Sequence, residues 1–240
     1  MMINTSDPNK LITTLHTPAY YLADVSRLVG ISKGRISRYL RGYDFQSSLK
    51  GNIYNRHKEP IIIDASTTGS YASFLDLIDL IYIKEFLKRG FTLQYLRKAL
   101  KEAEEYLGTP HFARSVFFTS GNDIIYKIPS DGSLIALLTG GQIGISNVVE
   151  IFWDKLDFER VSEFGYARRW FPKGKNGGIV IDPQISFGKP TLIGTGIATQ
   201  NVYDLYLGEG EVEDPVRKWF NIPITEIKTA VQFEQSLQCA

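Results

Sequence analysis

Cysteine is almost absent from this sequence of 240 residues, since Cys239 beside the C-terminus is the only one. A single cysteine cannot close a disulfide within the chain, as expected for a protein that works in a reducing cytoplasm. Long apolar runs are also missing. No stretch approaches the roughly 20 apolar residues of a membrane helix, and no basic-then-apolar leader opens the chain. We therefore expect a soluble, cytoplasmic protein.

Residues of the common catalytic and metal sites are few and scattered. His16, His57 and His111 lie in polar or loop contexts, and no serine stands in a G-x-S-x-G turn. The glycine-rich stretch 187–196 lacks the G-x-x-x-x-G-K-[ST] pattern of a phosphate loop, so a tight turn is the simpler interpretation. Asp182 precedes Pro183 and suits a turn cap better than a catalytic acid. We expect no enzyme activity, no metal and no cofactor.

Charge is unevenly spread, although the net charge of the chain is only +1. Residues 20–60 hold eight basic and three acidic side chains, a net charge of +5, which leaves −4 for the rest. A basic patch on a nearly neutral protein is a footprint for nucleic-acid phosphate, although a solvated surface can show the same excess.

The stretch 20–43, YYLADVSRLVGISKGRISRYLRGY, predicts two helices joined by a tight turn. Apolar residues at helical spacing indicate the first helix: Leu22, Val25, Leu28 and Val29. Gly30 suits the positive-φ residue that ends it, and Ser32 suits the N-cap of the second helix. The expected core positions of that second helix are Ile36, Tyr39 and Leu40.

This pattern is typical of a helix-turn-helix, whose second helix enters a DNA major groove about 12 Å wide. A helical hairpin inside an enzyme can look the same. The residues that we expect to face the groove are Lys33, Arg35, Ser37, Arg38 and Arg41. Arg35 and Arg38 are the candidates for base contact, because a guanidinium can bind guanine O6 and N7 together.

A hairpin with a basic tip is predicted after this pair of helices, from short strands around 53–54 and at 60–63. Such a hairpin suits a wing that lies along the phosphate backbone, and an ordinary surface hairpin is the alternative. The expected DNA-binding residues of the wing are Lys50, Asn52, Tyr54, Arg56 and Lys58.

Two further helices are predicted, from Ser70 or Ser73 to Arg89 and from Thr92 to Leu107, with Gly90 and Gly108 as stops. Together with 20–43, the run SFLDLIDLIYIKEFLKRGFTLQYLRKAL resembles the winged helix-turn-helix of MerR-type regulators over residues 20–107. The long dimerising coiled coil and the metal-sensing cysteines of that family are missing here. The resemblance implies DNA binding, without MerR-style effector sensing.

The remainder of the chain changes character at residue 111. Residues 111–172 alternate short β-prone runs with turns, including SGND at 120–123, and 173–178 (KGKNGG) suit a linker. From Gly178 the chain closely resembles the family called domain of unknown function 433, whose strand signature precedes three helices. The matching motif residues are Ile181, Asp182, Pro183, Gly188, Lys189, Pro190, Gly194, Thr195 and Ile197.

We therefore predict an α+β chain with four segments. These are a loose N-terminus (1–19), a MerR-like winged helix-turn-helix domain with a helical pair (20–110), a β-rich middle region (111–172) and a C-terminal domain with a β-arch and a three-helix bundle (173–240). This order resembles VapB-like antitoxins of toxin–antitoxin pairs.

The resemblance implies a VapC-like PIN-domain ribonuclease toxin as partner, binding to operator DNA, and repression of the shared operon. One recognition helix reads few bases, so a homodimer is expected. Phe233 and Leu237 in the tail are candidates for toxin contact. The alternatives are a free-standing transcriptional regulator, an effector-sensing regulator that uses the middle region as a pocket, or a protein-interaction module without DNA binding.

Overall fold

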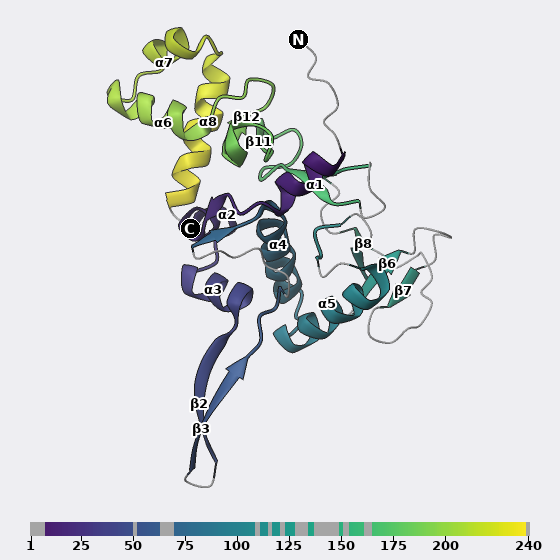
Figure 1. Ribbon diagram of the computed structural model, residues 1–240. Helices are drawn as coiled ribbons and strands as arrows, with labels where there is room; N and C mark the ends of the chain where they lie inside the picture. Colours follow the sequence, from purple (N-terminus) through teal and green to yellow (C-terminus); the bar gives the residue numbers. More distant parts are fainter. Residues whose placement is uncertain are drawn as a thin grey trace. The chain divides into compact units, whose positions relative to one another are not determined.

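The computed structural model describes residues 8–49, 52–62, 70–108, 111–114, 117–120, 123–127, 134–136, 149–150, 154–160 and 165–238. Within these ranges the fold mixes helices with small sheets, as the α+β prediction requires (Figure 1). The chain forms two compact units. The helix–hairpin unit comprises residues 16–151 and 162–166, and the C-terminal unit comprises residues 1–15, 152–161 and 167–240.

The helix–hairpin unit begins with two short helices and a two-stranded ribbon. Its first elements are β1 (Tyr20–Tyr21), α2 (Leu22–Val29), α3 (Lys33–Arg41), β2 (Tyr43–Leu49) and β3 (Asn52–Lys58). All three core positions predicted for α3 are buried, and so are three of the four predicted for α2; Leu28 is half-buried. The periodicity of 3.6 was therefore a sound guide to both helices.

The ribbon of β2 and β3 extends away from α3 (Figure 1). Its strands pair antiparallel over their whole length, from Tyr43 opposite Lys58 to Leu49 opposite Asn52. The strand expected at 60–63 is wrong for its described part: Ile61 and Ile62 are buried and both backbone N–H groups donate to the carbonyl of Tyr39. Their apolar side chains join the core beside α3 instead of extending the ribbon.

The helical pair follows as α4 (Phe74–Lys88) and α5 (Leu93–Leu107), with the short β4 (Tyr71–Ala72) paired to β1. Ser73 begins α4 with a capping box, in which its hydroxyl accepts from Asp76 N–H while the Asp76 carboxylate accepts from Ser73 N–H. Thr92 caps α5, and Gly108 ends it in the left-handed conformation. These capping residues agree with the sequence prediction.

A buried contact between a histidine and an aspartate ties α4 to the segment after α5. His111 Nδ1 lies 2.6 Å from Asp79 Oδ2, and Asp79 Oδ1 accepts from Ala113 N–H. Burial raises the pKa of the Asp79 carboxyl, and the facing His111 lowers it in part. The next strands are β5 (Phe117–Ser120), β6 (Asp123–Lys127), β7 (Leu134–Ala136) and β8 (Val149–Glu150), in the sheet order β7-β6-β5-β8.

The C-terminal unit contains a second four-stranded antiparallel sheet with three helices. Its strands are β9 (Leu156–Phe158), β10 (Ala167–Trp170), β11 (Ile179–Ile181) and β12 (Pro190–Leu192), and its helices are α6 (Thr199–Gly208), α7 (Glu213–Phe220) and α8 (Ile224–Gln238). Leu192 of β12 packs with Val202, Val216, Ile227 and other residues of the three helices in one core.

Two expected boundaries differ from the structure. Strands β10 and β11 are neighbours in the sheet β12-β11-β10-β9, although one precedes and the other follows residues 173–178. These residues therefore connect two strands of one sheet and do not link domains. At the other end, residues 8–16 form helix α1 (Pro8–His16) where a loose terminus was expected. Leu11 and Leu15, one helical turn apart, are both buried and explain that helix. Residues 1–7 lie outside the described ranges.

Candidate nucleic-acid interface

The turn between α2 and α3 is held by three hydrogen bonds around Gly30. Gly30 adopts φ 65° and donates its N–H to the carbonyl of Ser26, as a left-handed C-cap does. The Ser26 hydroxyl donates to the carbonyl of Ile31 at 2.7 Å, which holds the chain as it enters α3. The Lys84 ammonium of α4 donates to the carbonyl of Val29 at 2.5 Å. Burial lowers the pKa of Lys84, and neighbouring Lys88 lowers it further.

The exposed side of α3 carries a ridge of three arginines. Arg35, Arg38 and Arg41 are all exposed and recur every three residues, so they run along one side of the helix. Lys33 is exposed in the first turn, and Ser37 is half-buried. The side opposite the ridge holds Ile36, Tyr39 and Leu40 in the core. We call Arg35, Arg38 and Arg41 the arginine ridge.

The base of the hairpin is attached to the same core as α3. The carbonyl of Tyr39 accepts both Ile61 N–H and Ile62 N–H, and Arg97 Nε of α5 donates to the carbonyl of Glu59 at 3.1 Å. Burial raises the pKa of the Tyr39 phenol, while the charges of Arg35 and Arg97 lower it. These bonds connect the chain after β3 to α3 and α5.

Gly42 forms the junction between α3 and the hairpin. It has φ 71°, a conformation that side chains other than glycine rarely adopt. A Cβ at this position would also collide with the carbonyl oxygen of Lys58, with which β3 ends. The close approach of the two backbones therefore requires glycine at 42.

The hairpin has two chemically different faces, because successive residues of a strand point to opposite sides. Directly opposed residues share a face, and the register pairs Tyr43 with Lys58, Phe45 with Arg56 and Ser47 with Tyr54. One face is thus rich in aromatic and basic side chains. We call it the aromatic–basic face, and its members are Tyr43, Phe45, Tyr54, Arg56 and Lys58.

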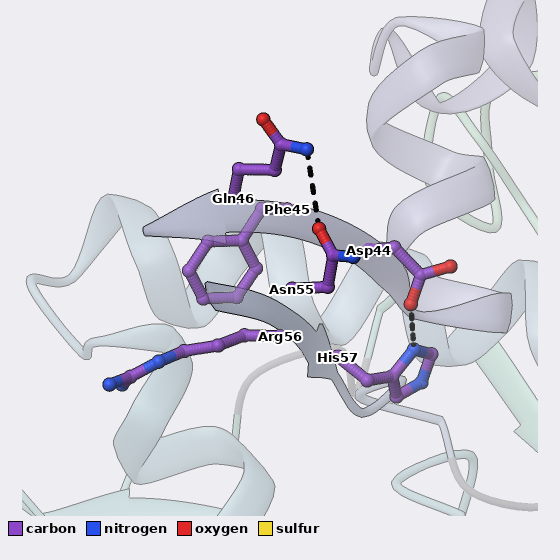
Figure 2. A pocket seen from close by; sticks show the side chains of 6 residues that line it. All are labelled: Asp44, Phe45, Gln46, Asn55, Arg56 and His57. Atoms are coloured by element: carbon purple, nitrogen blue, oxygen red, sulfur yellow. Dashed lines mark hydrogen bonds and ion pairs between the residues drawn. The ribbon is translucent and has the colours of Figure 1, made fainter. Parts of the chain in front are cut away.

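The other face is polar and internally hydrogen-bonded. His57 Nδ1 lies 2.7 Å from Asp44 Oδ1, and Gln46 Nε2 donates to Asn55 Oδ1 at 3.2 Å. Figure 2 shows these two pairs along the ribbon, with Arg56 extending away from them. We call this side the polar face. An open hollow of about 480 Å³ lies along the exposed ribbon and is lined by residues 44–46 and 55–57, which belong to both faces.

Arg38 connects the arginine ridge to the hairpin. Its guanidinium carbon lies 5.3 Å from the centre of the Tyr43 ring, within the range of a cation–π contact. Tyr43 belongs to the aromatic–basic face and pairs with Lys58, so basic groups continue from α3 onto one side of the ribbon. Phosphate oxygens are the natural counter-charge for such a surface.

The predicted hairpin residues fall on one side. Asn52, Tyr54, Arg56 and Lys58 are alternate residues of β3, so all four point to the aromatic–basic face, while Lys50 lies outside the described ranges. The sequence interpretation missed Tyr43 and Phe45, because it placed the first strand elsewhere. Their alternation with Asp44 and Gln46 was the available signal.

The motif residues at 182–195 build a turn in the C-terminal unit. Asp182 Oδ1 accepts from Gln184 N–H, and its Oδ2 accepts from Arg169 Nε at 2.7 Å, so the acid is a turn cap and an ion-pair partner. Lys189 and Thr195 are exposed. β11 and β12 pair antiparallel as neighbours, so this segment is a hairpin and not an arch between sheets.

The two tail residues differ in exposure. Phe233 is only 2% exposed and lies within the protein core, and Leu237 is half-buried. In this conformation a partner cannot reach Phe233. Among the residues that the structure describes, no cluster of three or more His, Cys, Asp or Glu side chains is arranged to hold a metal. The described helices also include none with the length and apolarity to span a membrane.

Comparison with known proteins supports the C-terminal resemblance. Residues 179–233 match the model of a family described as protein of unknown function (DUF433). The chain is 22% identical over 198 residues to a Mycobacterium tuberculosis (strain ATCC 25618 / H37Rv) protein named "Putative antitoxin VapB45", which covers 77% of this chain and 81% of that protein.

A solved structure has a similar fold. The crystal structure of Rv2018 from Mycobacterium tuberculosis aligns with a TM-score of 0.56, over 90% of this chain and 97% of that chain, at 12% sequence identity. A solved protein thus shares this α+β fold over nearly its whole length. The sequence comparison, in turn, finds a relative that is named as an antitoxin.

Proposed function

We propose that this protein is a DNA-binding antitoxin. It binds its operator through a MerR-like winged helix-turn-helix made of α2, α3 and the β2–β3 hairpin, and it binds a toxin through another surface. The observation that carries the DNA-binding part is the continuity of the arginine ridge with the aromatic–basic face through Arg38 and Tyr43. The antitoxin part rests on the name of the relative.

In this proposal α3 enters the major groove and the hairpin follows the phosphate backbone. Ile36, Tyr39 and Leu40 face the core, so the ridge on the opposite side is the part of α3 that can reach base edges. Lys33 and Ser37 flank it, and the four alternate residues of β3 contact phosphate. Two copies related by a two-fold axis would read half-sites about 34 Å apart.

The toxin of this proposal is a VapC-like PIN-domain ribonuclease encoded beside this protein. The antitoxin neutralises it by direct binding, and the pair represses the shared operon as a cytoplasmic repressor. The protein itself performs no catalysis in this scheme. Its role in transcription regulation is that of a binding module whose affinity for DNA sets the level of both proteins.

The first experiment is co-expression with the adjacent reading frame, followed by purification on this protein. We expect a stable complex in which the ribonuclease activity or toxicity of the neighbour is lost. A mobility-shift assay with the upstream DNA then tests the operator, with Arg38→Ala as the variant. A loss of roughly 1–3 kcal/mol at one operator position identifies a base contact, whereas an equal loss on all sequences identifies a phosphate contact.

Absence of any complex, together with binding to the upstream DNA, would leave a free-standing regulator. A complex without DNA binding would leave a protein-interaction module. The salt dependence of DNA affinity tests whether the protein contacts phosphate, because each phosphate contact adds about −0.9 to the slope of log K against log salt.

A further inference from the structure

The three C-terminal helices bear a surface that the DNA-binding proposal does not use. Residues 199–238 hold seven acidic and three basic side chains, a net charge of −4. This sign opposes contact with phosphate, so these helices are a poor second DNA-binding surface. Their exposed apolar side chains, in contrast, need another explanation.

Trp219 is the most prominent of these side chains, with 77% of its surface exposed. Tryptophan is highly buried on average in folded proteins, because it offers 150–250 Å² of largely apolar surface. Helix α7 buries its neighbour Val216 completely and packs Phe220 against the same core. Trp219 is therefore turned away from a core that its own helix helps to form.

Two other residues extend the apolar surface along α7. Val212 at the N-cap is 48% exposed, Pro215 is half-buried, and both share a side of the helix with Trp219 at spacings of three and four residues. Leu207 at the end of α6 is 45% exposed. Glu211 N–H donates to the carbonyl of Tyr206 at 2.8 Å, so the turn between α6 and α7 folds back onto the last turn of α6, which carries Leu207.

Acidic groups surround this apolar surface. Glu209, Glu211 and Asp214 are exposed, and Glu213 is half-buried. Burial raises the pKa of the Tyr206 phenol, and the negative charges of Glu211 and Glu213 raise it further. These two carboxylates therefore lie near the end of α6 that carries Leu207. Helix α7 carries two basic side chains, Arg217, which lies 3.4 Å from Asp214, and the exposed Lys218. An apolar centre with a charged rim is the usual anatomy of a protein–protein interface.

We propose that the corner formed by Leu207, Val212 and Trp219, with its acidic rim, is the docking surface for a basic protein partner. The occupant fits an RNA-handling protein, because such a protein carries lysines and arginines to bind phosphate. Trp219 inserts into an apolar pocket of that partner, and the carboxylates meet its basic rim. This inference rests on the proposed antitoxin function and assigns the toxin to this corner.

The test uses the full-length protein and the purified product of the adjacent reading frame. We expect Trp219→Ala to weaken the complex by about 30-fold or more, as loss of a central aromatic anchor does. Phe187→Ala is the matched control: Phe187 is 90% exposed in the same unit but lies between β11 and β12. That variant should bind the partner like the wild type. Both variants should retain the wild-type melting temperature and operator affinity.

A charge variant tests the rim separately. Glu209→Lys at the C-cap of α6 should slow association several-fold at low salt, with a smaller effect at high salt. Normal partner binding by Trp219→Ala would overturn this inference and leave the antitoxin function standing. Failure of the wild type to bind the partner would overturn both. If Trp219→Ala converts a dimer to a monomer and keeps its affinity for the partner, the corner joins two copies of this chain. That result would also overturn the assignment of the toxin to this corner.

Discussion

The arginine ridge with its hairpin and the corner of α6 and α7 are both exposed surfaces on small helical scaffolds, but their charges are opposite. Residues 20–60 carry +5, whereas residues 199–238 carry −4. Each surface also displays aromatic side chains: Tyr43 and Tyr54 on the hairpin, Trp219 on α7. Helix packing alone therefore does not select a partner. In the functions proposed above, the charges around the exposed aromatics do, because phosphate and a basic protein demand opposite signs.

Reversal of the charge of the arginine ridge should have the largest effect on the difference between the two surfaces. We expect Arg35→Glu, Arg38→Glu and Arg41→Glu together to abolish operator binding, a loss of at least about 3 kcal/mol, because three cationic contacts become repulsive. All three residues are exposed, so the melting temperature should change little. A mobility-shift titration measures the loss, and unchanged binding to the partner is the internal control. Retained operator affinity would remove α3 from the interface.

Gly42→Ala should have the next largest effect. The positive φ and the collision with the Lys58 carbonyl should lower the free energy of unfolding by about 1–3 kcal/mol and misplace the hairpin. Chemical denaturation and a DNA titration test the two consequences. Gly90→Ala is the control, since Gly90 has φ 90° but its added Cβ meets nothing within 4 Å. Equal effects of the two variants would mean that strain alone matters and that hairpin placement does not.

Substitutions on the two hairpin faces should separate their roles. Lys58→Ala on the aromatic–basic face should reduce the salt slope of DNA binding by about 1 and weaken all sequences alike. Asn55→Ala on the polar face removes only the bond to Gln46 and should leave the slope unchanged. Slopes can be obtained from fluorescence anisotropy at several salt concentrations. If Asn55→Ala alters the slope and Lys58→Ala does not, the hairpin meets DNA with its other face.

Gly34→Ala offers a finer test of the ridge. Gly34 is exposed in α3, has no positive φ, and its added Cβ would meet no atom within 4 Å. The substitution should raise the stability by up to about 1 kcal/mol through helix propensity and lower DNA affinity where α3 approaches the groove closely. Gly208→Ala in α6 is the control, because it makes the same change in helix propensity at a position that we do not expect to contact DNA. Unchanged DNA affinity in Gly34→Ala would mean that the start of α3 stays clear of DNA.

The smallest expected effect is a pH dependence of the hairpin. The hydrogen bond to Asp44 raises the pKa of His57, the charges of Asp44 and Glu59 add to it, and desolvation opposes them. A raised folded-state pKa means that the stabilisation is complete below the ordinary value of about 6.5 and is lost as pH rises through the folded value. An NMR titration should show the His57 pKa falling in Asp44→Asn and unchanged in Gln46→Ala. A wild-type pKa at or below the ordinary value would refute this pairing.

Sequence patterns predicted local elements well where a few neighbouring residues decide them. The helical spacing of Val25 and Val29, the stop at Gly30 and the caps at Ser73 and Thr92 all act within one or two turns. The predicted N-cap at Ser32 has the right position, but its side chain makes no capping hydrogen bond. The basic residues of α3 were also identifiable, because their exposure follows from the burial of Ile36 and Leu40 on the opposite side.

The strands were predicted less well, because pairing joins residues that are distant in sequence. Nothing local marks Trp170 as the partner of Ile181 in a sheet that crosses the expected linker. The β2 strand was missed because residues 43–46 and 48 are exposed on both faces, so it lacks the apolar run that usually marks a strand. Its partner strand β3 was placed correctly only around Ile53 and Tyr54.

The sequence by itself determined the α+β character, the basic window 20–60, the helices of the N-terminal region and the C-terminal family motif. Composition and short-range periodicity are sufficient for these features. Only the tertiary structure decided that alternate residues of β3 share one face, that Arg38 stacks on Tyr43, and that Trp219 stays outside the core while Val216 enters it. Register and burial depend on the whole chain, and they decide which charged groups can act together on a partner.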